Sequence, residues 1–241
     1  PDWVTDLSPE AGATVFFYQR FDPDGPRYAN NFGNEAGIMS KFVYEFYDNL
    51  PAFTFLIEAQ PHLRLFFRRV DCLRPNATFS ALNAWDLSSV KVRRFPNSDH
   101  QHRVWLEACF RKVLSIVGVE MPPKKWSKTA MILYDTFIVS REVLHRHPKS
   151  VYEELHEALG TGPRCVTGMP YNNTISTLVF HPYWRRQENP KTNGKFGKGR
   201  ISAYASEWFS HTIWGGRPVN EPYVPVCSQW YNDTVCPGSP C

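Results

Sequence analysis

The sequence predicts an α/β domain in which helices cover a mostly parallel sheet. Two observations predict it: short runs of β-forming residues recur along the chain, and longer segments with apolar residues at helical spacing alternate with them. Residues 1–216 are expected to form this single domain, and residues 217–241 a Pro- and Cys-rich tail without a core of its own. Because ligands bind at the carboxyl ends of strands in such sheets, polar residues that follow a strand are candidates for a site.

Three segments are predicted as strands. They are residues 14–19 (TVFFYQ), 53–57 (FTFLI) and 130–139 (AMILYDTFIV). The last two are expected to share one sheet. Residues 22–34 are dense in Gly, Pro, Asn and Asp, which predicts a loop, and Asp22-Pro23-Asp24 within it is expected to form a turn.

Helices are predicted where apolar residues line one face of a 3.6-residue period. The segments are residues 35–49, 99–117, 149–159 and 200–214. Asn34 is the expected N-cap of the first helix, and Leu50-Pro51 its end. Ser140 is expected to cap a further short helix, and residues 63–98 are expected to be mostly irregular.

Polar residues stand at the beginning of the first predicted helix. Asn31 and Gly33 precede it, and Glu35 lies in its first turn. The N-terminus of a helix attracts phosphate, because its backbone N–H groups point outward and carry partial positive charge. These residues are therefore candidates for holding the ribose or phosphate of a nucleotide. Helix capping with a tight turn at Gly33 is the alternative interpretation.

A second polar group follows the predicted strand 53–57. Glu58, Gln60 and His62 lie just beyond its carboxyl end. Mn²⁺ and Mg²⁺ prefer carboxylate oxygens, so Glu58 with His62 is a candidate metal site. The alternative is a set of ordinary polar residues leaving a strand, which the lack of a second carboxylate favours.

Composition and charge exclude some classes of partner. Aromatic residues make up 15% of the chain, and they serve either as core or as surfaces that stack on sugar rings. The formal net charge is only +4, dispersed in isolated doublets, which argues against nucleic acid as a partner. No apolar window approaches the length of a membrane span.

Cysteines and glycosylation sequons indicate the compartment. The six cysteines lack the CxxC spacing of zinc or redox motifs, and three of them lie in the last 15 residues. This usage predicts disulfides and a secreted or secretory-pathway protein. The cysteines are Cys72, Cys109, Cys165, Cys227, Cys236 and Cys241. The Asn-x-Thr sequons at Asn76, Asn172 and Asn232 also indicate a secretory setting. Asn232 is the favoured glycosylation site, because the composition of the tail cannot form a core that would bury it.

Several stretches together form a pattern. They are Asn31-Phe-Gly33-Asn-Glu35, residues 47–51 (YDNLP), residues 55–62 (FLIEAQPH), residues 137–144 (FIVSREVL) and residues 206–215 (SEWFSHTIWG). The pattern resembles the uncharacterised family known as domain of unknown function 3431, over residues 3–216. The resemblance implies a layout similar to GT-A glycosyltransferases, with a Rossmann-like mixed sheet that binds a nucleotide-sugar. The disulfide-bearing irregular tail expected after residue 216 follows from its prolines and cysteines.

The resemblance also implies roles for residues. In GT-A enzymes a DxD-type motif after a strand holds a metal ion and the donor diphosphate, and a carboxylate on a late helix often acts as the base. Glu58, Gln60 and His62 fall at the first of these positions, and Glu207 falls at the second. The residues expected to contact the donor are Asn31, Gly33, Glu35 and Gln60.

The chain departs from that pattern in three places. Asn34 stands where the family has Arg, no Asp-x-Asp follows the strand 53–57, and the family's first strand would precede Trp3. Two hypotheses follow. One is a glycosyltransferase that uses a nucleotide-sugar with Mn²⁺ or Mg²⁺ and acts on a glycan or glycoprotein. The other is a catalytically silent relative that serves as a structural or glycan-contacting component of an extracellular assembly, with protein partners.

Overall fold

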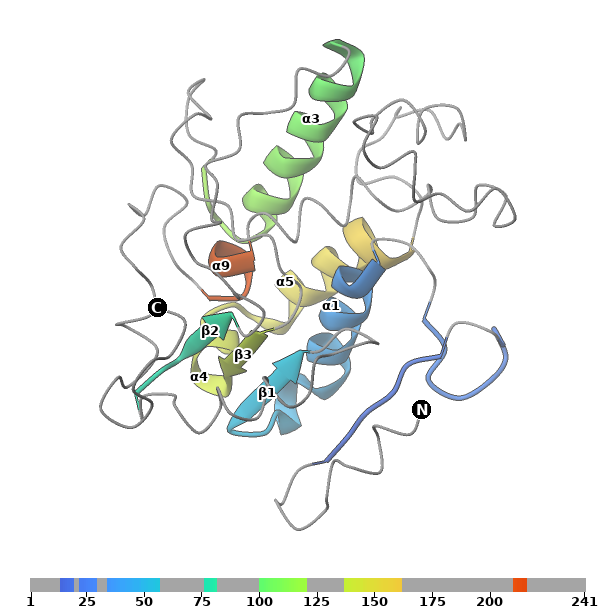
Figure 1. Cartoon of the computed structure of the whole chain (residues 1–241), viewed down its shortest axis with the longest axis vertical. Helices are drawn as coiled ribbons and strands as arrows, with labels where there is room; N and C mark the ends of the chain where they lie inside the picture. Colours follow the sequence, from blue (N-terminus) through green and yellow to red (C-terminus); the bar gives the residue numbers. More distant parts are fainter. Residues whose placement is uncertain are drawn as a thin grey trace, which may run out of the picture.

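The computed structural model describes residues 14–19, 22–29, 34–56, 76–81, 100–120, 137–161 and 210–215. Helices surround a small sheet in this part of the chain (Figure 1). The elements are α1 (Asn34–Phe46), η3 (Tyr47–Asn49), β1 (Phe53–Leu56), β2 (Phe79–Ala81), α3 (His100–Ile116), β3 (Phe137–Ser140), α4 (Arg141–Leu144), α5 (Lys149–His156), η6 (Glu157–Thr161) and α9 (Ser210–Ile213).

The sheet has the strand order β1-β3-β2, and both ladders are antiparallel. In the ladders, Leu56 of β1 and Ala81 of β2 both pair with Phe137 of β3. The pairing of β1 with β3 joins the two strands that were expected to share a sheet. The expected parallel order differs from the two described ladders, because β3 runs opposite to both of its neighbours.

The position of β2 was not predicted, since it lies within the stretch expected to be mostly irregular. Only Phe79 of its three residues is a strong β-former, and three residues are too few to show an alternating pattern. The strand forms because Phe79 is buried and its ring lies 5.3 Å from the ring of Phe137 on the adjacent strand. Tertiary packing therefore determines this element.

Helix α1 lies close to its predicted bounds, although Asn34, the expected N-cap, is its first helical residue. It begins at Asn34, continues as the η3 turn and ends before Leu50 and Pro51, because proline does not continue a helix. The residues Ala36, Met39 and Val43 recur at helical spacing and are buried. This face packs against α5 and η6.

The core lies between the sheet and the helices α1, α3, α5 and α9. All four residues of β3 are buried, and the indole ring of Trp214 lies 6.0 Å from the ring of Phe137. Trp214 also stacks on Tyr152 at 6.3 Å with an interplanar angle of 16°. Since Trp214 is 1% exposed, its aromatic surface serves the core and is not available to stack on a sugar.

Residues 14–19 do not form the predicted strand. They are extended and make a single parallel bridge, between Gln19 and Tyr28. The reason is that their rings pack on a helix instead of joining a sheet. The ring of Phe16 lies 5.6 Å from that of Phe42 and 4.8 Å from that of Phe46, both on α1.

The turn predicted at Asp22-Pro23-Asp24 is confirmed. The Asp22 carboxylate accepts a hydrogen bond from the backbone N–H of Asp24 at 3.1 Å, and its carbonyl accepts one from Gly25 at 3.1 Å. A Cβ on Gly25 would stand 2.8 Å from the Asp22 carboxylate, so a larger residue there would have to displace that side chain. The Asp22-Pro23-Asp24 stretch therefore serves its own backbone.

Ser140 caps α4 as predicted. Its hydroxyl accepts a hydrogen bond from the backbone N–H of Val143 at 3.3 Å. Among the described helices, none is long and apolar enough to traverse a lipid bilayer.

Candidate functional site

The described residues include few of the side chains that the sequence singled out for a site. Glu35 is the second residue of α1, and Asn34 is the first. The remaining candidates for catalysis, donor binding and metal binding lie outside the described residues. They are Asn31, Gly33, Glu58, Gln60, His62 and Glu207.

Two of the described segments that flank these candidates meet at one residue of β3. Leu56, two positions before Glu58, is the Cα partner of Phe137. The ring of Phe137 lies 6.0 Å from that of Trp214, which directly follows the short helix α9. Helix α1 runs antiparallel to β1, so the N-terminus of α1 and the carboxyl end of β1 point toward the same end of the domain (Figure 1). The segments next to Glu58 and Glu207 therefore meet at Phe137, and the N-terminus of α1 points toward the same end of the domain.

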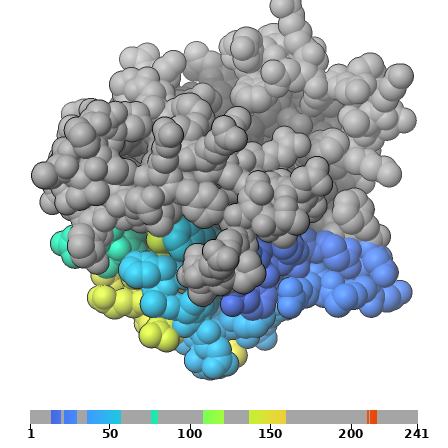
Figure 2. All heavy atoms as spheres, turned by 60° about the horizontal axis from the view of Figure 1, so that its bottom comes forward, coloured from blue at the N-terminus to red at the C-terminus, as the bar shows by residue number. Residues whose placement is uncertain are grey.

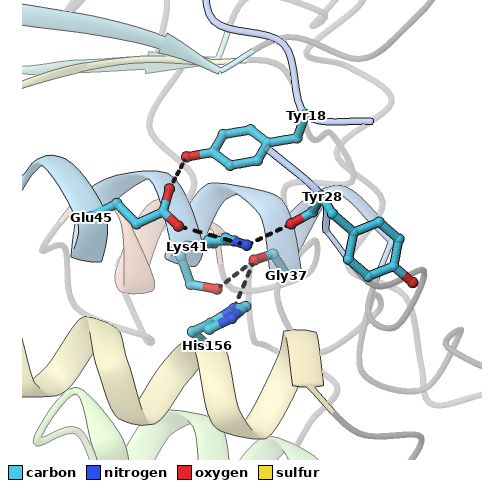
Figure 3. A network of polar contacts seen from close by, with 7 residues as sticks. Tyr18, Tyr28, Gly37, Lys41, Glu45 and His156 are labelled. Carbon is cyan, nitrogen blue, oxygen red and sulfur yellow. Dashed lines mark hydrogen bonds and ion pairs between the residues drawn. The ribbon is translucent and has the colours of Figure 1, made fainter. Parts of the chain in front are cut away.

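A polar network connects residues 14–29, α1 and α5 (Figure 3). We call it the α1 network. The Tyr18 hydroxyl donates to the Glu45 carboxylate at 2.5 Å, and the other oxygen of that carboxylate pairs with the Lys41 ammonium at 3.6 Å. The ammonium also donates to the backbone carbonyl of Tyr28 at 2.5 Å, whereas the Tyr28 ring points away from the network. On the other side of α1, the network ends at His156 and Gly37.

Electrostatics fix the protonation state of Tyr18. Burial raises the pKa of its hydroxyl far above the usual value, and the hydrogen bond and negative charge of Glu45 raise it further, while the positive charge of Arg27 lowers it. The phenol is therefore a neutral hydrogen-bond donor at any physiological pH. It cannot act as a general base here.

His156 joins α5 to α1. Its Nδ1 lies 3.2 Å from the carbonyl oxygen of Gly37, which accepts only, so Nδ1 carries the proton. Burial lowers the pKa of the imidazole, as does the charge of Lys41, while the Gly37 hydrogen bond, Glu45 and Glu157 oppose this. The neutral ring therefore acts as a donor that fixes one helix against the other.

The α1 network has a positioning role. Ala29 is 3% exposed, its N–H donates to the Gln19 carbonyl at 2.9 Å, and the preceding Tyr28 carbonyl is held by Lys41. The segment 30–33 with its two candidate residues thus lies between an anchored residue and the first residue of α1. Sequence reasoning missed the network. Its one local signal is the i,i+4 spacing of Lys41 and Glu45.

His145 and His147 both contact Tyr47 of η3. His145 is exposed, and its Nε2 lies 3.0 Å from the Tyr47 carbonyl. His147 is half-buried, and its carbonyl accepts from the Tyr47 hydroxyl at 2.6 Å. No group of three or more His, Cys, Asp or Glu that could hold a metal ion occurs among the described residues.

Two of the predicted modification residues are described. Cys109 is fully buried on α3 and disulfide-bonded. Asn76 is exposed in the turn before β2. Asn172, Asn232 and the cysteines Cys72, Cys165, Cys227, Cys236 and Cys241 lie outside the described residues.

Comparison with known proteins gave no relative. No protein-family model matches the chain, and searches of the curated proteins and of the solved structures found no match.

Proposed function

We propose that this chain is a glycosyltransferase-like protein of the secretory pathway or extracellular space, which transfers a sugar from a nucleotide-sugar to a glycan or protein hydroxyl. The observation that carries the proposal is that Leu56 of β1 and Trp214 after α9 both meet Phe137, at the end of the sheet toward which the N-terminus of α1 points. The three segments concerned are the helix that begins at Asn34, the strand that ends at Leu56 and the short helix α9. Each of them adjoins residues that the GT-A resemblance places in a donor site.

The proposed roles follow from position and chemistry. Asn31, Gly33 and Glu35 stand at the N-terminus of α1, where a helix holds phosphate or ribose. Glu58 and His62, with Gln60, follow β1, where a Mn²⁺ or Mg²⁺ ion with the donor diphosphate would be held by carboxylate oxygen. Glu207 is proposed as the general base that removes the proton from the acceptor hydroxyl.

A silent module is the second candidate. Its specific support is the use of Asp22 within its own turn, together with Asn34 in place of a basic phosphate partner at the start of α1. Such a module would contact glycans or protein partners of an extracellular assembly without turnover.

The first test is ligand binding to the intact chain. UDP or GDP with Mn²⁺ is expected to raise the melting temperature, because a ligand at a hundredfold excess over its Kd stabilises the folded state by about 2.7 kcal/mol. A chain whose melting temperature is unchanged by millimolar UDP, GDP and Mn²⁺ has no donor site.

The second test is the Glu207→Gln substitution, which is nearly isosteric. Turnover is expected to fall by about 10²–10⁴-fold, the usual contribution of a positioned general base. Donor binding should remain, since the base contacts the acceptor. An active wild type with an equally active Glu207→Gln variant would reject the mechanism. A wild type that binds nucleotide but transfers nothing would support the silent module.

The secretory setting is part of the proposal. The disulfide at Cys109 supports it, because disulfides persist in oxidising compartments. Peptide mapping without reductant is expected to find the six cysteines oxidised, with a bridge in the tail among Cys227, Cys236 and Cys241. Free thiols at all six positions would contradict the assignment to the secretory pathway or extracellular space.

A further inference from the structure

The Lys41 side chain joins α1 to the segment that precedes it. Its ammonium donates to the Tyr28 carbonyl at 2.5 Å, lies 3.6 Å from a carboxylate oxygen of Glu45 and stands 5.8 Å from the centroid of the Tyr18 ring. Figure 3 shows the ammonium between the Glu45 carboxylate and the Tyr28 carbonyl. Because the Lys41 side chain is only 22% exposed, water screens these contacts less than it screens those of a surface lysine.

The contact between Lys41 and the Tyr28 carbonyl encloses the stretch with the candidate residues Asn31 and Gly33. Lys41 lies about two helical turns, or about 10 Å, beyond Asn34, where α1 begins. The chain must cover that distance between Tyr28 and Asn34. Since a chain spans at most about 3.6 Å per residue, fixing the Tyr28 carbonyl limits where residues 30–33 lie.

Other contacts hold residues 14–29 on α1 without Lys41. The Phe16 ring packs on two rings of the helix, and the N–H of Ala29 donates to the Gln19 carbonyl at 2.9 Å. Figure 2 shows residues 14–29, in blue, at the surface of the described part of the molecule beside the lighter blue atoms of residues 34–56. Loss of the Lys41 ammonium is therefore expected to act locally, on the backbone that follows Tyr28.

Lys149 offers a matched comparison. Its ammonium lies 3.3 Å from the Asp48 carboxylate and 5.6 Å from the centroid of the Tyr44 ring, so it also combines an ion pair with a tyrosine ring. These two partners belong to η3 and α1, and not to residues 14–29. A substitution of Lys149 thus removes similar interactions at a different place.

We propose that Lys41 is a positioning residue, which holds the Tyr28 carbonyl and thereby fixes residues 30–33 at the N-terminus of α1 for contact with the nucleotide donor. The lysine acts through the backbone of Tyr28. It therefore sets the affinity for the donor, whereas the chemical step at the acceptor hydroxyl belongs to Glu207. The donor-binding part of this inference rests on the proposed function, and the positioning of residues 30–33 does not.

The positioning is tested by amide hydrogen exchange of the full chain without nucleotide. Lys41→Met removes the charge and keeps a similar helix propensity. Residues 28–33 are expected to exchange faster in this variant than in the wild type, while β3 and α5 keep their rates. Lys149→Met should leave residues 28–33 unchanged, and Lys41→Arg, which retains a cationic donor, should restore slow exchange. Wild-type rates in Lys41→Met overturn the inference, and so does faster exchange throughout the chain.

The effect on the donor is tested by calorimetry with UDP or GDP and Mn²⁺. The Kd is expected to rise about tenfold in Lys41→Met, the factor that corresponds to one lost hydrogen bond from a charged donor, and to stay unchanged in Lys149→Met. In transfer assays KM for the donor should rise and kcat should not fall. An unchanged Kd overturns the donor-binding part. A wild type that binds neither nucleotide rejects the proposed function and this part together, while hydrogen exchange still decides the positioning.

Discussion

Two regions of the molecule are each held by a tyrosine hydroxyl, and they differ in what accepts the hydrogen bond. In the N-terminal region, residues 14–29, the half-buried Tyr18 donates to the charged carboxylate of Glu45. In the core, Tyr152 is 1% exposed and donates to the neutral backbone carbonyl of Leu144 at 2.7 Å. The first contact belongs to an ionic network partly open to water, and the second to a dry aromatic stack with Trp214.

The two regions therefore contribute to stability in different ways. The ring of Tyr152 removes apolar surface from water and fills space, so its loss leaves a cavity. The Tyr18 contact adds a hydrogen bond and a charge interaction that water and salt screen in part. The core is therefore expected to set the free energy of unfolding, while the α1 network sets where residues 14–29 lie.

The largest effect is expected from Tyr152→Ala. Truncating a buried aromatic ring typically lowers the free energy of unfolding by about 3–5 kcal/mol, because transfer and cavity terms add. Urea denaturation of the full chain measures it. The matched control is Tyr152→Phe, which keeps the ring and loses one hydrogen bond, for about 1 kcal/mol. Equal losses in both variants would show that the hydroxyl, and not packing, stabilises the core.

Tyr18→Phe is expected to have a smaller effect, about 1 kcal/mol, because the ring packing remains and the lost hydrogen bond is partly exposed. A double-mutant cycle with Glu45→Gln isolates the pair, and the coupling should shrink at high salt. Limited proteolysis should cleave residues 14–29 faster in Tyr18→Phe than in Tyr152→Phe. Additive single mutants would show that the two groups are not coupled.

The smallest effect concerns pH. Burial lowers the pKa of His156 and of His147 below the usual value, so the unfolded chain takes up protons that the folded chain resists. This contribution to stability is complete above a pH of about 6.5, the unfolded pKa, and is lost as the pH falls below it. His156→Gln should reduce the slope of stability against pH in that range. A slope identical to that of the wild type would exclude His156 as a source.

Local signals in the sequence predicted α1, α3 and α5 well, while residues 200–209 of the last predicted helix lie outside the described residues. The end of α1 at Leu50-Pro51 and the cap of α4 by Ser140 depend on neighbouring residues, which a single sequence displays. The pairing of the strands was harder to predict from the sequence. The register that sets Leu56 opposite Phe137, and the existence of β2, depend on packing between segments far apart in the chain.

In the candidate site, too, local features were predicted from the sequence and contacts between distant residues were not. The turn at Asp22 was predicted because aspartate bonds its own backbone two residues on, which is a local property. The α1 network was missed because Tyr18 meets Glu45 and His156 meets Gly37 only after the chain has folded. The placement of Glu35 at the start of α1 agrees with its predicted first-turn position. The roles of Glu58 and Glu207 stay predictions.

The strand order has a consequence for how the chain is made. In the described sheet, β1 and β2 both pair with β3, which is synthesised last of the three. At a translation rate of about 5–20 residues per second, β1 leaves the ribosome about 4–16 seconds before its partner, since about 80 residues separate them. During that interval β1 lacks the described strand that pairs with it. The ladder between β1 and β3 therefore forms only after residues 137–140 have been synthesised.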